Sequence, residues 1–158
     1  MSLCSKMDPD YELVAPLIQA YLSQVSSAMK VSDILAKHDN STEITPDHLI
    51  GGLVYRLMVS MTETELHESI DTAKEIMDKL EHTDSEEETD YDELDECYDI
   101  SNDTIVPRKL KPPKCNCDIC SHLRVCLLNY KDYECNDELA QRFKDSIDHT
   151  CEKHKIYI

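Results

Sequence analysis

The sequence contains no tryptophan, one phenylalanine and only two glycines among its 158 residues. So few glycines exclude the glycine-rich loops with which nucleotide-binding proteins hold phosphate groups. The HExxH motif of metalloproteases and the GxSxG motif of serine hydrolases are also missing. We therefore expect a protein that is not an enzyme, with a core built from leucine, isoleucine, valine, methionine and tyrosine.

The sequence also lacks a long apolar run. No stretch reaches the roughly 18 to 20 apolar residues that a membrane-spanning helix needs. The first ten residues, MSLCSKMDPD, do not have the charged-then-apolar pattern of an export signal. We expect a soluble intracellular protein, located in the nucleus, the cytoplasm or a virion, with no membrane segment. In a reducing compartment, cysteines bind metal ions more often than they form disulfides.

Basic residues are scarce: 16 lysines and arginines stand against 33 aspartates and glutamates, which gives a net charge of −17. Residues 82–104, the acidic tract, carry eleven acidic residues and no lysine or arginine. A chain this acidic is repelled by DNA phosphates, so we do not expect direct nucleic-acid binding. The tract has too little apolar content to offset the entropy of ordering, which predicts a disordered linker suited to basic protein partners.

The first 81 residues have the apolar spacing of helices. Asp8 followed by Pro9 is typical of an N-cap with proline at the first helical position. Pro16 lies too deep for that helix start, so we expect either a short opening helix to about Ala15 or a kink there. The main helix then runs to about Lys37.

Two further helix starts follow. Thr45, which precedes a proline, predicts the second helix, and Thr62 with Glu65 three residues later forms a capping box for the third. Gly51 and Gly52 lie inside the second helix, at a cost of about 1 kcal/mol each relative to alanine. They indicate either a close approach by another backbone or a weak, frayed helix start.

Six of the eight cysteines fall in the last 44 residues. Cys115, Cys117 and Cys120 have the spacing CxCxxC, which lets two or three thiolates meet at one ion from a tight turn. Thirty residues later the segment HTCEKH repeats that spacing with mixed ligand types. We interpret the two segments as the halves of a zinc site.

The preferred ligand set is a Cys3His tetrahedron of Cys117, Cys120, Cys151 and His154. The main rival is a local site in which Cys115 and Cys126 join Cys117 and Cys120, and a second ion is compatible with the remaining ligands. The reserve ligands are Cys115, Cys126, Cys135, His122 and His149. The alternatives to zinc are buried free cysteines, disulfides in an oxidising particle and, with lower weight, an iron–sulfur cluster.

These patterns predict a mainly α-helical protein with an N-terminal helical bundle at 1–81. An acidic and then basic, proline-rich linker follows at 82–114, and a Cys/His-rich zinc-binding module at 115–158. A module of 44 residues is too small to fold on apolar burial alone, so the metal would supply the missing stability. The remaining histidines are expected to be ordinary surface or capping residues: His38, His48, His67 and His82.

Residues 21–53 resemble the central part of the histone fold, with a long helix, a short polar loop and a second helix that opens on EITPDHL. The matching residues are Ile44, Thr45, Pro46, His48 and Leu49. The resemblance implies dimerisation through the long helix and a place in transcription or chromatin assemblies. The basic residues with which histones face DNA are absent from the segment.

We therefore expect a non-catalytic zinc-binding adaptor that pairs with itself or with a protein partner through its helical half. The alternative is an assembly protein, for example of a large DNA virus, with its cysteines in disulfides. A metal-dependent hydrolase or redox enzyme is the third hypothesis. It ranks last because a zinc site rich in thiolates is usually closed and structural.

Overall fold

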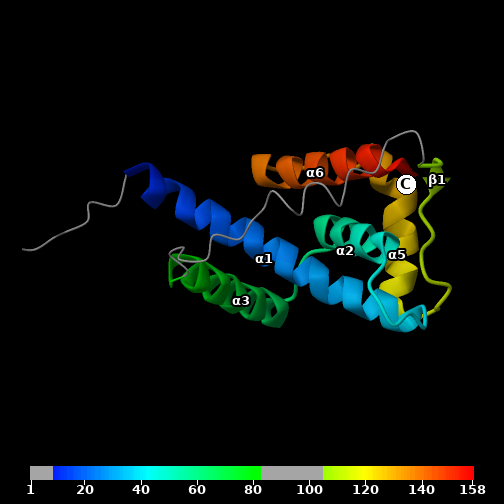
Figure 1. The fold of residues 1–158 in the computed structure, drawn as a ribbon, viewed down its shortest axis with the longest axis horizontal. Helices are drawn as coiled ribbons and strands as arrows, with labels where there is room; N and C mark the ends of the chain where they lie inside the picture. Colours follow the sequence, from blue (N-terminus) through cyan, green and yellow to red (C-terminus); the bar gives the residue numbers. More distant parts are fainter. Residues whose placement is uncertain (1–8, 83–104) are drawn as a thin grey trace, which may run out of the picture.

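The computed structural model describes residues 9–82 and 105–158, and this part of the chain is mainly helical (Figure 1). The predicted fold class is confirmed. No helix in these two ranges is long and apolar enough to cross a membrane. The predicted disordered tract lies outside the described residues, apart from His82 at the end of α3. The helices are α1 (Pro9–His38), α2 (Pro46–Met58), α3 (Glu63–His82), α5 (Asp118–Asn129) and α6 (Glu138–His154).

Helix α1 is a single helix of 30 residues that contains Pro16. The predicted end of an opening helix near Ala15 is therefore wrong. Proline has no backbone N–H, so the carbonyl of Glu12 loses its helical hydrogen bond. Pro16 is exposed, and water can bond to that carbonyl, which lets the helix continue through the proline.

Helix α2 begins where the sequence predicts, after Thr45. The side-chain oxygen of Thr45 accepts a hydrogen bond from the backbone N–H of His48, and the backbone N–H of Thr45 donates to His48 Nδ1 at 3.1 Å. His48 thus takes the place that glutamate has in the usual capping box. Its predicted role as a capping residue is confirmed, although the side chain is buried rather than exposed.

At Gly52 the backbone of α2 lies close to that of α1. A Cβ atom at this position would lie 2.5 Å from the carbonyl oxygen of Ala28, a distance that no side chain tolerates without movement of the backbone. The predicted close approach is therefore confirmed for Gly52. Gly51 differs, because a Cβ atom there would meet only the side-chain tips of Leu35 and Leu123, at 3.2 Å.

Helix α3 has the predicted capping box at its start. The backbone N–H of Thr62 donates to Glu65 Oε2 at 3.0 Å, and the backbone N–H of Glu65 donates to Thr62 Oγ1 at 3.2 Å. Glu65 also accepts a hydrogen bond from Arg56 of α2 at 3.3 Å. Ser69 and Ala73 of α3 are buried, and the helix lies along α1 in Figure 1.

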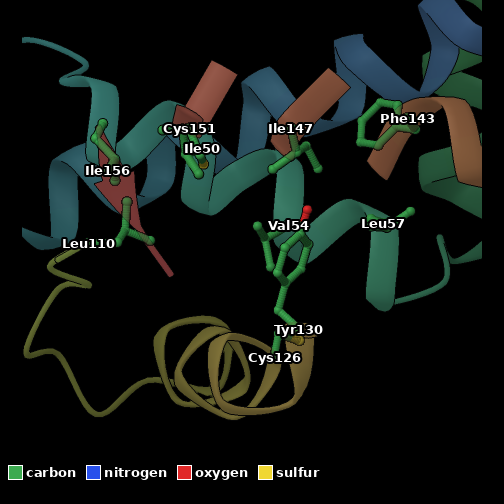
Figure 2. Packing of buried hydrophobic residues seen from close by; sticks show 10 residues of the cluster. All are labelled: Ile50, Val54, Leu57, Leu110, Cys126, Tyr130, Phe143, Ile147, Cys151 and Ile156. Carbon is green, nitrogen blue, oxygen red and sulfur yellow. The ribbon is translucent and has the colours of Figure 1, made fainter. Parts of the chain in front are cut away.

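The helices on both sides of the acidic tract share one core. Helix α2 packs against α1, α5 and α6, and in Figure 2 its side chains lie between those of α5 and those of α6. Residues 115–158 therefore do not depend on an apolar core of their own. The largest buried cluster consists of Ile50, Val54, Leu57, Leu110, Cys126, Tyr130, Phe143, Ile147, Cys151 and Ile156.

The basic, proline-rich stretch before residue 115 is fixed to the helical body. Its strand β1 (Arg108–Lys109) pairs in parallel with β2 (Ile156–Tyr157) after α6. Arg108 donates a hydrogen bond to Asp47 Oδ2 of α2 at 2.9 Å, and this guanidinium helps to lower the pKa of Asp47 although partial burial opposes the shift. Leu110 is buried in the shared core. The stretch thus carries the chain to the start of α5 along a defined path.

Candidate metal centre

The structure brings one histidine and three cysteines together from three segments of the chain. His38 belongs to the last turn of α1, Cys115 and Cys117 to the loop before α5, and Cys120 to the first turn of α5. Their side-chain ligand atoms all lie within 4.8 Å of one another. This is the only such group of three or more metal-ligating side chains in residues 9–82 and 105–158.

His38 is held at the end of α1 by a defined helix stop. The backbone N–H of Ser41 donates to the carbonyl of Ala36 at 2.9 Å, and that of Asn40 donates to the carbonyl of Lys37 at 3.1 Å. Asn40 has a φ of 53°, so the two bonds form a Schellman motif with asparagine in the left-handed position. The motif fixes the last turn of α1 and with it the Cα position of His38.

The residue after His38 ties this helix end to α2. Asp39 Oδ2 lies 2.8 Å from His48 Nε2. Because His48 Nδ1 accepts a hydrogen bond from the N–H of Thr45, Nε2 carries the hydrogen and donates a hydrogen bond to Asp39. The helix end that carries His38 is thereby fixed by α2 as well as by its own backbone.

The CxCxxC segment forms the start of α5. Cys117 is the N-cap, and its Sγ accepts a hydrogen bond from the backbone N–H of Cys120 at 3.4 Å. Cys115 Sγ accepts from the backbone N–H of Cys117, also at 3.4 Å. Helix N-termini stabilise thiolates through such N–H groups and through the helix dipole. The local backbone therefore favours the charged form of sulfur that metals bind.

Distances within the group approach those of a tetrahedral site. His38 Nδ1 lies 3.1 Å from Cys117 Sγ and 3.4 Å from Cys120 Sγ. Bond lengths of about 2.3 Å to sulfur and 2.0 Å to nitrogen give a zinc tetrahedron with edges of about 3.5 to 3.8 Å. Small movements of side chains would bring all four atoms to one ion.

The group lies at the border between core and solvent. Cys120 is fully buried, Cys115 and Cys117 are half-buried, and His38 is exposed. Beneath them lies the second buried cluster, which includes Leu35 and Leu123. An apolar floor of this kind keeps water away from the inner side of a bound ion.

The Cys117 and Cys120 thiols have pKa values shifted in opposite directions. The N–H of Cys120, together with hydrogen bonds from neighbouring side chains, lowers the pKa of Cys117 to about 6. Burial and the hydrogen bond to Cys117 raise the pKa of Cys120. Without a metal the pair therefore holds one thiolate near neutral pH, and an ion has to displace the remaining proton.

Arg124 holds the cysteine-bearing loop from one side. Its Nη1 donates to the carbonyls of Pro113 at 2.9 Å and of Cys115 at 2.8 Å, and its Nη2 lies 3.2 Å from Ser121 Oγ. One guanidinium thus fixes the backbone on both sides of Lys114. Partners of this kind orient the ligands of a metal site without touching the ion.

The predicted ligands fall into two sets. Cys117, Cys120 and the reserve ligand Cys115 belong to the group, whereas Cys126 and Cys151 are buried in the largest apolar cluster. His154 is exposed in the last turn of α6. The structure thus places the HTCEKH segment outside the group. The six described cysteines are all free, with no disulfide among them.

His38 is the member of the group that sequence reasoning missed. It lies 77 residues before Cys115, and no motif connects the two positions. The one usable signal is that CxCxxC supplies three ligands and a tetrahedral ion needs a fourth. Seven histidines and five further cysteines were candidates for that place, and only the packing of α1 against α2 and α5 selects His38.

A scan against protein-family models gives no match, and searches of the curated proteins and of the solved structures give none either.

Proposed function

We propose that this protein is a non-catalytic zinc-binding adaptor, in which a Cys3His zinc site joins α1 to α5 and the exposed half of α1 binds a protein partner. The observation that carries the proposal is the group of His38, Cys115, Cys117 and Cys120, whose ligand atoms lie within 4.8 Å of one another.

The chemistry of the donor set supports zinc. Three thiolates and one imidazole suit a soft or borderline cation, whereas calcium and magnesium prefer oxygen ligands. An iron–sulfur cluster would require a fourth thiolate, and the group has three. Four protein ligands also fill a tetrahedral site completely, which leaves no position for a substrate or an activated water. A closed site of this kind has a structural role.

The positions of the ligands support a role in holding separate helices together. His38 and Cys115 are 77 positions apart in the chain, with α2, α3 and the acidic tract between them. An ion bound to both would close that long loop and constrain the unfolded chain. Because α1 would then be anchored at its C-terminal end, its N-terminal half could project as a rigid binding element.

That half of α1 exposes an apolar face. Leu13 is 74 % exposed and Leu17 is 58 % exposed. A groove of about 770 Å³ between α1 and α6 continues this face, and its walls include Val14, Ile18 and Leu139. Contiguous apolar surface on a helix is typical of a protein-binding site, and a second copy of the chain or another helical protein would fit it.

The resemblance to the histone fold supports the same assignment. The long helix of that resemblance corresponds to α1, and its second helix to α2, which starts after Thr45. Pairing of histone-fold proteins through the long helix makes a chromatin or transcription assembly the setting that we propose. The acidic tract would then contact basic proteins such as those found in chromatin.

The zinc site is tested by elemental analysis of the full chain after purification under reducing conditions. We expect about one zinc per chain, and a cobalt-substituted protein should give the spectrum of a tetrahedral site with three thiolates. A folded protein that contains no metal would contradict the proposal. A cobalt spectrum that shifts when small anions are added would point instead to an open, catalytic site.

The partner-binding face is tested by sedimentation and cross-linking of a Leu13→Asp/Leu17→Asp variant. We expect wild-type chains to self-associate or to bind a helical partner, and we expect the variant to lose that association while it keeps its zinc. Val125→Asp is the matched control, because Val125 is a 54 % exposed residue on α5. Equal association by all three proteins would show that the exposed face of α1 is not the binding element.

A further inference from the structure

A second groove lies on the side of the molecule where β1, α5 and the C-terminal residues meet. It has a volume of about 420 Å³. Its lining is mostly apolar and includes Leu127, Leu128 and Ile158, and Leu128 is 83 % exposed. An exposed leucine at the edge of an apolar hollow provides a contact that a ligand side chain can cover. We name this hollow the basic groove, for the charges described next.

Three cationic side chains line the basic groove: Lys109, Arg124 and Lys131. No aspartate or glutamate side chain lines it. Lys109 and Lys131 are exposed, and neither forms an ion pair with a residue that the structure describes. In a chain with a net charge of −17, this is a local concentration of the scarce sign of charge.

Arg124 gives the groove a fixed wall. Its Nη1 is held by the carbonyls of Pro113 and Cys115 at 2.9 and 2.8 Å. Because a guanidinium keeps its charge when its N–H groups bond to neutral carbonyls, Arg124 adds a positive potential at a fixed place. Lys109 and Lys131 carry mobile ammonium groups that can follow a ligand.

The combination of an apolar lining and a cationic rim selects among ligands. The groove has no aromatic side chain in its lining, so it offers no platform on which nucleic-acid bases could stack. An acidic peptide can instead place leucine-like side chains on the apolar lining while its carboxylates meet the lysines.

We propose that the basic groove binds short acidic peptide segments that carry leucine-like side chains. Carboxylates of the peptide would pair with Lys109 and Lys131, and one apolar side chain would cover Leu127, Leu128 and Ile158. This site is separate from the exposed face of α1 and from the metal group. It would give the adaptor a second partner of opposite charge to those bound by the acidic tract.

The proposal is tested by fluorescence anisotropy on the zinc-loaded full chain, with a labelled synthetic peptide of the sequence EDLEELLDELED at physiological salt. A Lys109→Glu/Lys131→Glu variant should bind the peptide at least about 10-fold more weakly, because two attractions become repulsions. A Lys74→Glu/Lys153→Glu variant changes the net charge by the same amount at exposed positions outside the groove. It should keep the wild-type affinity within about 2-fold.

The apolar part of the proposal has its own variant. Leu128→Ser should weaken peptide binding about 10-fold, since it removes most of an apolar contact. The exposure of Leu128 makes the substitution compatible with folding. A peptide in which serine replaces every leucine should lose affinity for the wild-type chain to a similar extent.

The chain's own acidic residues can compete with the peptide, so a second full-length protein is needed. In it, the eleven acidic residues of 83–104 are replaced by asparagine and glutamine. Peptide binding by either protein, weakened at least about 10-fold by Lys109→Glu/Lys131→Glu, supports the proposal. Absence of binding by both proteins overturns it. The proposal is also overturned if an oligothymidine displaces the peptide and Leu128→Ser leaves the affinity for the oligothymidine unchanged. The groove would then be a phosphate site.

Discussion

Five of the six cysteines in residues 105–158 fall into two groups with opposite surroundings. Cys115, Cys117 and Cys120 gather at a helix N-terminus, where backbone N–H groups point at sulfur. Cys126 and Cys151 lie among apolar side chains in the shared core (Figure 2). The same residue type thus belongs in one place to a group that could hold a metal ion and serves in the other as a small apolar side chain.

The pKa values of the thiols express this difference. Hydrogen bonds to Cys117 lower the pKa of its thiol to about 6, whereas burial raises the pKa of Cys151 to about 11. At neutral pH the first is mostly a thiolate and the second a neutral thiol. Clustering in the sequence therefore does not identify metal ligands unless the groups around each sulfur are also considered.

The largest expected effect is on zinc affinity when a ligand is removed. Cys120→Ala should weaken zinc binding about 1,000-fold, because one of four ligand bonds is lost. Cys126→Ala is the matched control, since both cysteines are buried in α5 and only Cys120 belongs to the metal group. Competition with a chromophoric chelator measures both affinities. If Cys126→Ala lost zinc to the same extent, the division into two groups would be wrong.

The next effect concerns thiol reactivity in the chelator-treated protein. Cys117 should react with iodoacetamide about 100-fold faster than Cys151 at pH 7, because the thiolate is the nucleophile and Cys151 remains protonated and buried. Mass spectrometry of isotopically labelled peptides gives both rates. Added zinc should then protect Cys117 and leave Cys151 unchanged. Equal rates in the folded protein would contradict the comparison.

A smaller effect on zinc affinity is expected when the cysteine-bearing loop loses the support of Arg124. Arg124→Ala should reduce zinc affinity about 10- to 100-fold, because it releases the carbonyls of Pro113 and Cys115 and leaves all four ligands in place. Arg142→Ala is the control, since Arg142 forms an exposed ion pair with Glu138 on α6. Unchanged zinc affinity in Arg124→Ala would mean that the loop keeps its shape without the guanidinium.

The two cysteine groups also mark how far local sequence patterns extend. The starts of α2 and α3 were predicted from Thr45 and Thr62, since capping acts over three or four residues. The CxCxxC spacing likewise predicted that two or three of its thiols converge. Each of these features depends on neighbours in the sequence, and each is present in the structure.

What the sequence did not reveal depends on contacts between distant residues. His38 reaches the metal group because α2 and α5 hold the end of α1 beside the cysteine loop. The HTCEKH segment has the same spacing as CxCxxC. Its Cys151 nevertheless lies on the face of α6 that packs into the core beside residues of α2. Spacing along one helix predicts which residues share a face, but it does not predict what that face contacts.

The smallest expected effect concerns the buried cysteines and is a change of the free energy of unfolding with pH. Burial, and to a lesser degree the charge of Asp148, raises the pKa of Cys151 from 9.0 to about 11. A neutral thiol is therefore favoured in the folded state, and its contribution to stability is complete below pH 9. About 2 kcal/mol of it is lost by pH 10.5 and about 3 kcal/mol in all once the pH exceeds 11, since one pKa unit corresponds to about 1.4 kcal/mol.

Cys151→Ala isolates this contribution. Tyr130 and Cys126 also have raised pKa values because they are buried, so wild-type protein should lose stability through several groups in alkali. Urea unfolding at pH 8 and pH 10.5 should show a smaller loss for the variant, because the zinc site and the other two groups are common to both proteins. At pH 8 the variant should be about 1 kcal/mol less stable, through the cavity left by sulfur. Equal losses in alkali would mean that the Cys151 thiol ionises as freely in the folded chain as in the unfolded one, and the contrast between the two cysteine groups would then rest on position alone.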